Sequence, residues 1–218
     1  MIKDTQTTGV DQGGCVGPVK TNCIGYRMTA SPKIQLIEPL LKWLDSLPRV
    51  VPLRAVSPGE PSSPSSNEKR LEQWITDSRL LADSLITAML WLRIGIIDPP
   101  HEIVQAETTP LASYLHGVVH RLEGDYWNSK YWFRQVRDSQ LLQSLSHSME
   151  EKLRESNLFS FAADLKIMQG SSFVPSEFVS TCEQQSQQTM QDVEIAASLE
   201  HLGWAEWASL WDLIYQEF

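Results

Sequence analysis

The sequence contains few cysteines, and none of them is paired as a disulfide framework or a metal knuckle would require. Cys15, Cys23 and Cys182 are odd in number and scattered along the 218 residues, and no Cys-x-x-Cys pair occurs. Disulfide-stabilised domains and cysteine-based zinc modules both depend on paired cysteines at short, regular spacings. The sequence therefore argues against both kinds of protein.

A long apolar run and a cluster of basic residues are also missing. The longest apolar stretch, from Leu85 to Ile97, is interrupted by Arg93 and is shorter than the roughly 20 residues that span a bilayer. The first residues contain no apolar segment of the signal-peptide kind, so we expect a cytoplasmic protein. A formal net charge of −9 repels phosphate backbones and anionic lipid surfaces. We therefore expect neither nucleic acid nor a membrane among its partners.

Several common catalytic motifs are absent as well. The sequence has no Gly-x-Ser-x-Gly elbow, no phosphate-binding loop with its lysine and no His-Glu-x-x-His motif. Cys182 has no feature in the sequence that would activate its thiol as a nucleophile. Serine hydrolases of the elbow type, P-loop enzymes and zincins are thereby disfavoured.

What the chain does have is helical periodicity. Apolar residues recur every three or four positions over most of its length, and no segment alternates for long enough to predict a strand. We predict an all-α fold, an irregular bundle of antiparallel helical hairpins. Residues 1–30 lack periodicity and are predicted to be a mobile tail, whereas residues 31–218 form a single helical domain. The prolines clustered between Pro48 and Pro64 predict an extended linker at about residues 48–66 of that domain.

Capping and turn residues set the expected helix boundaries. Ser65 and Glu68 have the spacing of a capping box and start a long helix that ends near Gly95. Asp98 is expected to cap the next helix, because two prolines of first-turn type follow it. The predicted helical segments are 34–47, 65–95, 98–106, 109–122, 127–137, a stripe over 141–153, a helix opening at residue 175, and 193–218 with a candidate break at residue 203.

The segment around Gly124 resembles a tetratricopeptide helical hairpin. Gly117, the turn triplet Gly124–Tyr126, Ser129 and Phe133 stand at the small, turn and aromatic positions of that motif. A small residue lets two helices approach closely, and a glycine makes the turn without Cβ strain. The resemblance implies an antiparallel hairpin. A true repeat array is not expected, because the preceding unit is shorter than the usual repeat.

Two histidines and a carboxylate share one face of the helix before this turn. His116, His120 and Glu123 are spaced at i, i+4 and i+7, which places them within about 60° of one another around the helix axis. Imidazole and carboxylate are ligand types that a divalent transition metal binds. We therefore predict His116, His120 and Glu123 as metal ligands.

Other polar residues flank this stripe. His101 and Gln105 are four residues apart on the preceding predicted helix, and Asp125 and Asn128 follow across the turn. A structural polar network is the alternative explanation for all of these residues. In that network Glu123 would hydrogen-bond His120, and the neighbouring arginines would neutralise the two acids as ion pairs, Arg121 and Arg134.

The middle of the chain also resembles an uncharacterised family of bacterial and fungal proteins. The resemblance rests on HEIVQ at His101–Gln105, on SYLHGVVHRLEGDYWN at Ser113–Asn128 and on YWFRQV at Tyr131–Val136. Weaker similarity continues at Phe173–Val179 and at Glu206–Asp212. Together these segments cover about half the chain and none of its first 70 residues.

The resemblance implies a shared polar site but names no activity. The positions that it implies are His101, Gln105, Tyr114, His116, His120, Glu123, Asp125 and Asn128. The chain departs from the family pattern at Leu115, where an aromatic residue is commoner, and at Leu122, where a basic residue is. With Arg134 added from the following helix, these residues form the candidate ligand-binding set.

Two hypotheses of function follow. In the first, the hairpins present a groove to a protein partner or to a small polar ligand; we prefer it, because helical hairpins more often bind than catalyse. In the second, the protein is a metal-dependent hydrolase. His116, His120 and either Glu123 or Asp125 would then hold a divalent transition metal, His101 would be a further ligand or a general base, and a metal-bound water would be the nucleophile.

Overall fold

The computed structural model describes residues 32–49, 51, 65–77, 83–188 and 192–216, and its fold is all-α. The predicted tail at 1–30 and most of the predicted linker at 48–66 lie outside these residues. The elements of the described residues are α1 (Pro32–Ser46), α2 (Ser66–Asp77), α3 (Ser84–Arg93), α4 (Asp98–Gln105), α5 (Pro110–Glu123), α6 (Tyr126–Gln135), α7 (Ser139–Glu155), α8 (Phe159–Asp164), β1 (Met168–Gln169), β2 (Ser172–Phe173), α9 (Pro175–Gln187) and α10 (Val193–Gln216).

The long helix predicted from residue 65 to residue 95 is wrong, because the structure has two helices there, α2 and α3. Asp83 caps α3: its Oδ1 accepts hydrogen bonds from the backbone N–H groups of Leu85 and Ile86, at 2.9 and 3.0 Å. Its backbone is extended, with φ −121° and ψ 107°, which no residue inside a helix adopts. The apolar stripe runs through both segments because both bury residues in one core, Leu71 on α2 and Met89 on α3.

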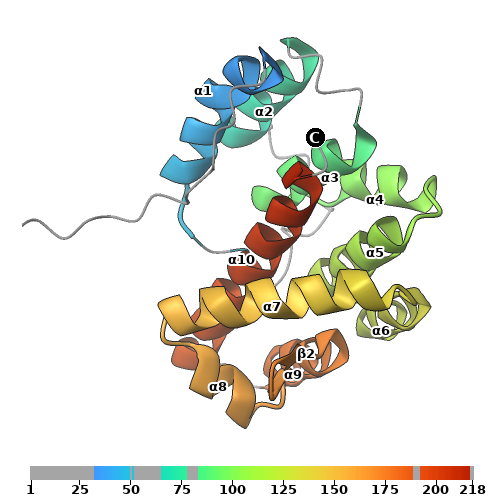
Figure 1. Cartoon of the computed structure of the whole chain (residues 1–218), viewed down its shortest axis with the longest axis vertical. Coiled ribbons are helices and arrows are strands. Elements are labelled where there is room, and N and C mark those ends of the chain that lie inside the picture. The colour runs from blue at the N-terminus through green and yellow to red at the C-terminus, as the bar shows by residue number, and fades with distance from the viewer. Residues whose placement is uncertain (1–31, 50, 52–64, 78–82, 189–191, 217–218) are drawn as a thin grey trace, which may run out of the picture.

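Helix α10 packs against both α7 and α3 and carries much of the core (Figure 1). Leu199, Leu202 and Trp207 are buried, and the indole N–H of Trp207 donates to the carbonyl of Met89 on α3 at 2.7 Å. The expected break at Gly203 is wrong, since α10 is continuous. A Cβ at Gly203 would lie 3.4 Å from the Cβ of Val51, so the glycine allows Val51 to pack closely against α10.

Two short strands, β1 and β2, form a small hairpin that the sequence does not predict. Met168 pairs with Phe173 and Gln169 with Ser172 in an antiparallel register. Gly170 makes the turn with a φ of 62°, a conformation that favours glycine. Strands of two residues are too short to show an alternating pattern, which is why none was predicted.

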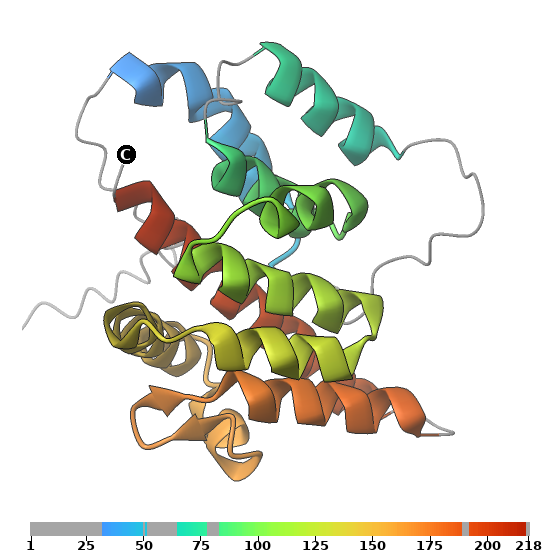
Figure 2. The same ribbon diagram turned by 90° about the vertical axis from the view of Figure 1, so that its right-hand side faces the viewer.

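The helices that matter for the site are α4, α5 and α6. Thr109 caps α5 by accepting from the N–H of Ala112 at 3.1 Å, and Gly124 ends it with a left-handed φ of 81°. Gly124 therefore turns the chain back, and α5 and α6 form the predicted hairpin. Figure 2 shows α5, α6 and α9 stacked one on another, consistent with their contacts.

Close packing holds this hairpin together at Gly117. A Cβ at this position would lie 2.9 Å from the ring of Phe133, so only glycine fits without displacing the ring. Across the same interface the hydroxyl of Ser129 donates to the carbonyl of Gly117 at 2.7 Å.

Among the described residues, no helix is both long and apolar enough to cross a membrane.

Candidate metal centre

Three histidines from two helices meet beside the start of the hairpin. His101 comes from α4, and His116 and His120 come from successive turns of α5. One nitrogen of each ring can be chosen so that all three nitrogens lie within 4.8 Å of one another. The turn between α4 and α5 is short, so α4 folds back along α5 and adds His101 to the pair that the sequence places on one face.

The three rings contact one another directly. The rings of His116 and His120 are nearly parallel, with centroids 4.8 Å apart and an interplanar angle of 11°. His101 meets both rings edge-on, at 4.9 Å in each case. On α6, Trp132 stacks on the ring of His116 with centroids 4.0 Å apart. The cluster is therefore compact and is supported by an aromatic residue from the other arm of the hairpin.

Glu123 joins two of the histidines through one carboxylate. Its Oε1 lies 2.9 Å from Nδ1 of His101, and its Oε2 lies 2.8 Å from Nδ1 of His120. An ionised carboxylate can only accept hydrogen bonds, so each Nδ1 atom carries the hydrogen and donates the hydrogen bond. In the neutral imidazoles this leaves both Nε2 lone pairs free. A carboxylate that fixes histidine tautomers in this way is a recurrent feature of metal sites, where it lies outside the ligand shell.

His116 is the most deeply buried histidine of the cluster. It is 4% exposed, and its Nδ1 has no hydrogen-bond partner among the described residues. Burial, together with the neighbouring His120 and His101, lowers the pKa of His116 from 6.5 to about 4. The ring is therefore neutral at pH 7 and has a lone pair available. Its buried nitrogen is a polar atom whose desolvation nothing in the described protein offsets.

The donor set fits a transition metal with nitrogen ligands. Three imidazoles with one open position are the ligand set of many catalytic zinc sites. Zinc–nitrogen bonds of 2.0–2.1 Å in a tetrahedron place the nitrogens about 3.3 Å apart. Nitrogens separated by up to 4.8 Å would therefore have to draw together by up to about 1.5 Å as the rings tilt. Side-chain rotation on two adjacent helices provides a movement of this size.

The geometry gives Glu123 a different position from the one predicted. The sequence placed it among the metal ligands beside His116 and His120. In the structure its two oxygens contact Nδ1 of His101 and Nδ1 of His120, and the group of three possible ligands consists of His101, His116 and His120. His101 is 31% exposed and Glu123 24%, so these two side chains form the solvent-facing edge.

The other candidate residues do not join the cluster. Gln105 and Arg134 are exposed. Asp125 caps α6: its Oδ1 accepts from the backbone N–H of Asn128 at 3.2 Å, and its Oδ2 accepts from the side-chain amide at 2.6 Å. These two residues therefore stabilise the start of a helix.

Asp98, expected as a cap, lies in the first turn of α4, where its negative charge interacts favourably with the helix dipole.

Tyr114 belongs to a second, fully buried network on α5. Its hydroxyl donates to Oε1 of Glu206 on α10 at 2.7 Å, and Arg121 donates to both oxygens of the same carboxylate. The guanidinium also lies 4.2 Å from the ring centre of Phe178 on α9. The sequence offered Arg121 as a partner for the acids near the turn, but its ion pair is with Glu206.

The charges of Arg121 and Glu206 neutralise each other within this network. Burial and the Glu206 carboxylate raise the pKa of Tyr114 well above its ordinary value. Burial lowers the pKa of Arg121, but Glu206, Cys182 and Tyr114 together raise it above its ordinary value. Burial raises the pKa of the nearby Cys182 thiol to about 11, which makes it a poor nucleophile. Glu206 was not predicted, because nothing in the sequence links it to a residue 85 positions earlier.

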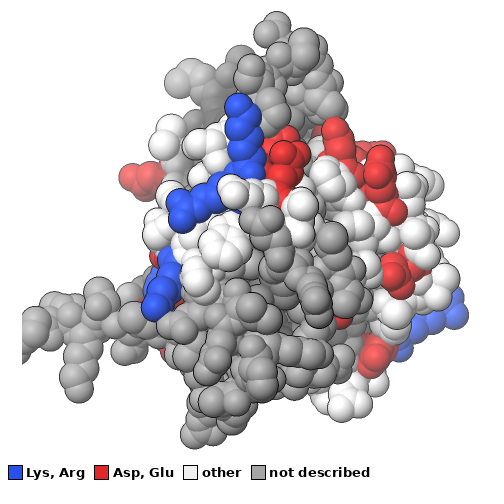
Figure 3. Space-filling model, turned by 90° about the horizontal axis from the view of Figure 1, so that it is seen from above, with Lys and Arg blue, Asp and Glu red and all other residues white. Residues whose placement is uncertain are grey.

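The surface around the histidines is acidic on the α4 and α5 side. From residue 94 to residue 129 the only Lys or Arg is Arg121, which is buried. Acidic side chains gather on the side of the molecule where α4 lies (Figure 3). A cation approaching the cluster would therefore meet an attractive field.

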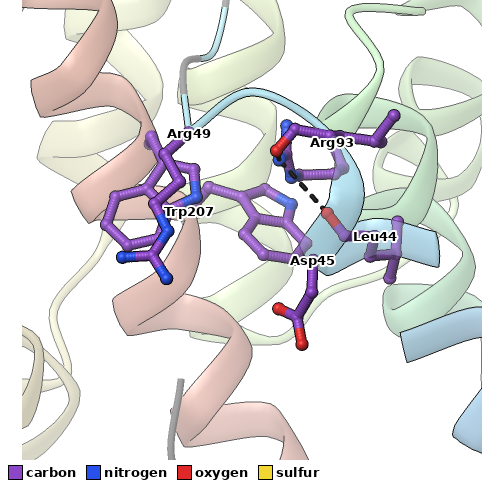
Figure 4. A pocket seen from close by; sticks show the side chains of 7 residues that line it. Leu44, Asp45, Arg49, Arg93 and Trp207 are labelled. Atoms are coloured by element: carbon purple, nitrogen blue, oxygen red, sulfur yellow. Dashed lines mark hydrogen bonds between the residues drawn. The ribbon is translucent and has the colours of Figure 1, made fainter. Parts of the chain in front are cut away.

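A separate pocket lies between α1, α3 and α10 (Figure 4). The space between its lining atoms, counted together with the adjoining open solvent, is about 240 Å³, and the lining includes Asp45, Arg93 and Trp207. The Arg93 guanidinium donates to the carbonyls of Leu47 and Pro48, at 3.3 and 2.7 Å. These carbonyls follow the end of α1, where a cation is favoured, so the arginine here supports the fold.

Comparison of the chain with protein-family models, with curated protein sequences and with solved structures found no match.

Proposed function

We propose that the protein binds one divalent transition metal ion, preferably zinc, through His101, His116 and His120, and that it is a metal-dependent hydrolase. The observation that carries this proposal is the convergence of three imidazoles, two of which have their tautomers set by one carboxylate. This arrangement favours the second of the two hypotheses drawn from the sequence over the binding groove.

A purely structural polar network explains the histidines less well. Such a network satisfies its buried polar atoms, and the Tyr114–Glu206–Arg121 cluster on the same helix does so. The histidine cluster instead leaves Nδ1 of His116 buried and unpartnered within the described protein. Bringing three imidazoles into contact also costs free energy whenever one is protonated, whereas an ion shared by all three offsets that cost.

The chemistry of the proposed site follows from its charges. A zinc ion lowers the pKa of a bound water to about 7 and so supplies hydroxide at neutral pH. The three neutral imidazoles leave the charge of the ion undiminished, and Glu123 holds two of them in the binding tautomer. Because His101 and Glu123 are partly exposed, a substrate would approach a bound ion from the edge that these two side chains form.

Metal titration tests the proposal. Purified protein, stripped with a chelator, is titrated with Zn²⁺ and Co²⁺ in competition with a chromophoric chelator. We expect one equivalent to bind, and we expect His101→Ala, His116→Ala and His120→Ala each to weaken binding by more than the roughly 10–100-fold that outer-shell changes cause. His147→Ala is the matched control, because His147 is a 76% exposed histidine on α7. Equal affinity in all four variants would overturn the proposed site.

Turnover tests the hydrolase part. The zinc-loaded protein is assayed against 4-nitrophenyl acetate and 4-nitrophenyl phosphate as general ester probes. We expect hydrolysis with at least one probe that is lost on chelation, is restored by zinc and is absent from His116→Ala. Tight metal binding without metal-dependent turnover of acyl or phosphoryl esters would contradict the hydrolase assignment and leave the metal site standing.

A further inference from the structure

One face of α6 exposes two large aromatic side chains to solvent. Trp127 is 71% exposed and Tyr131 is 41% exposed. The two residues are four positions apart, and their rings are nearly parallel, with an interplanar angle of 9° and centroids 6.2 Å apart. We call this pair the aromatic platform.

The platform is continuous with the histidine cluster through Trp132. The ring of Tyr131 meets that of Trp132 edge-on with centroids 5.6 Å apart, and Trp132 stacks on His116 at 4.0 Å. Four rings therefore form an unbroken series from the solvent-exposed Trp127 to a proposed metal ligand. A ligand bound at the metal position would meet the platform if its substituent extended past Trp132 along α6.

We propose that Trp127 and Tyr131 form the subsite for an aromatic ring of the substrate, whose ester or amide oxygen binds at the metal position. This inference rests on the proposed function and names its substrate class, an aromatic acyl compound. Offset stacking on Trp and Tyr favours a flat aromatic ring over an alkyl group of similar size. Specificity would then come from α6 and reactivity from α4 and α5.

The charge of the zinc-loaded site favours a substrate group that develops negative charge on oxygen over a substrate group that is a cation. A divalent ion, three neutral imidazoles and the Glu123 carboxylate leave a local charge of about +1, which attracts a developing oxyanion. Arg134 follows Tyr131 by three positions and lies on the same face of α6, where it is exposed. Once the ion is bound, a basic group on the substrate would meet the net positive charge of the site and the guanidinium of Arg134.

A matched pair of inhibitors isolates the aromatic contribution. Acetohydroxamate and benzohydroxamate carry the same metal-binding head group and differ in a methyl or a phenyl substituent. Their dissociation constants are measured by calorimetry on the zinc-loaded full-length protein. We expect benzohydroxamate to bind roughly tenfold tighter, since stacking on one aromatic side chain is typically worth that much.

Variants of the platform decide the assignment. In Trp127→Ala and Tyr131→Ala we expect the preference for benzohydroxamate to fall below about threefold, with acetohydroxamate binding and zinc affinity unchanged. Trp127→Phe keeps an aromatic ring and should retain most of the preference. Val193→Ala removes a 79% exposed apolar side chain on α10 and should change nothing.

The failures are distinguishable. If the titration shows no zinc binding, the proposed metal site is wrong and the platform falls with it. If zinc binds and neither hydroxamate does, the subsite is overturned while the metal site stands. If both bind equally, or if the phenyl preference survives in Trp127→Ala and Tyr131→Ala, the platform is overturned while the metal site stands. A phenyl preference that disappears only in the two alanine variants supports the subsite.

Discussion

The change Glu123→Gln tests the centre most sharply, because it alters one polar group and little of the shape. The wild-type carboxylate accepts from Nδ1 of His101 and from Nδ1 of His120 at the same time. A glutamine side chain offers one accepting oxygen and one donating amide. It can satisfy one histidine in the binding tautomer, but it faces the other with a donor.

The second histidine must then move its proton to Nε2 or lose its hydrogen bond. In the first case its lone pair points to the introduced amide and away from the proposed ion, and in the second the ring is no longer held. Changes of this outer-shell kind lower metal affinity by about 10–100-fold, or roughly 1.4–2.7 kcal/mol. We expect a loss in this range, smaller than the loss in His120→Ala.

Competitive zinc titration measures the effect, and Glu102→Gln is the control. Glu102 is an exposed carboxylate next to His101 on α4, so its change removes the same charge without touching the hydrogen bonds. Histidine tautomers are read independently by nitrogen NMR of the metal-free protein. An affinity for Zn²⁺ in Glu123→Gln equal to that in Glu102→Gln would refute the assigned role of the carboxylate.

Three further predictions concern stability. Gly117→Ala places a Cβ 2.9 Å from the ring of Phe133 and should cost about 1–3 kcal/mol in urea unfolding; an unchanged or increased stability would mean that the two helices separate freely. Arg121→Met leaves Glu206 buried without its cation and should cost about 3–5 kcal/mol, and adding Glu206→Leu should recover much of it; no recovery would contradict the pairing. His116 has a pKa of about 4 in the folded protein and 6.5 in the unfolded chain, so the unfolded chain binds a proton first as the pH falls. The metal-free protein should therefore keep its full free energy of unfolding above pH 6.5 and lose up to about 3 kcal/mol of it by pH 4. Urea unfolding with chelator present measures this loss, and His116→Gln should lack it.

Local features of the site could be predicted from the sequence because helical periodicity is a local property. The spacing of His116, His120 and Glu123 put them on one face, and Gly124 ended the helix where a left-handed glycine was expected. The proximity of His101 followed from a short turn between two helices. These inferences need only the helix repeat and the preference of glycine for positive φ.

Features that depend on distant contacts could not be found in this way. The pairing of Arg121 with Glu206 joins α5 to α10, and no spacing rule reaches across 85 residues. The stacking of Trp132 on His116 depends on how closely α5 and α6 approach, which Gly117 and Phe133 decide together. The same limit explains the role of Glu123: a periodic pattern places a carboxylate near imidazoles but does not say which nitrogen it binds.

Helix α5 carries two polar assemblies, and their difference is the strongest reason to assign chemistry to one of them. On one side, Tyr114 and Arg121 supply the donors that the buried Glu206 carboxylate accepts, so the charges are neutralised within the fold. On the other side, Glu123 accepts hydrogen bonds from Nδ1 of His101 and Nδ1 of His120, and the buried Nδ1 of His116 has no partner among the described residues. The stability of the fold alone would favour a hydrogen-bond partner for every buried polar atom of the second assembly, as in the first. The lone pairs kept free there have a physical rationale if an external electrophile is shared among them, and a metal ion meets that requirement with three ligands and one position left for reaction.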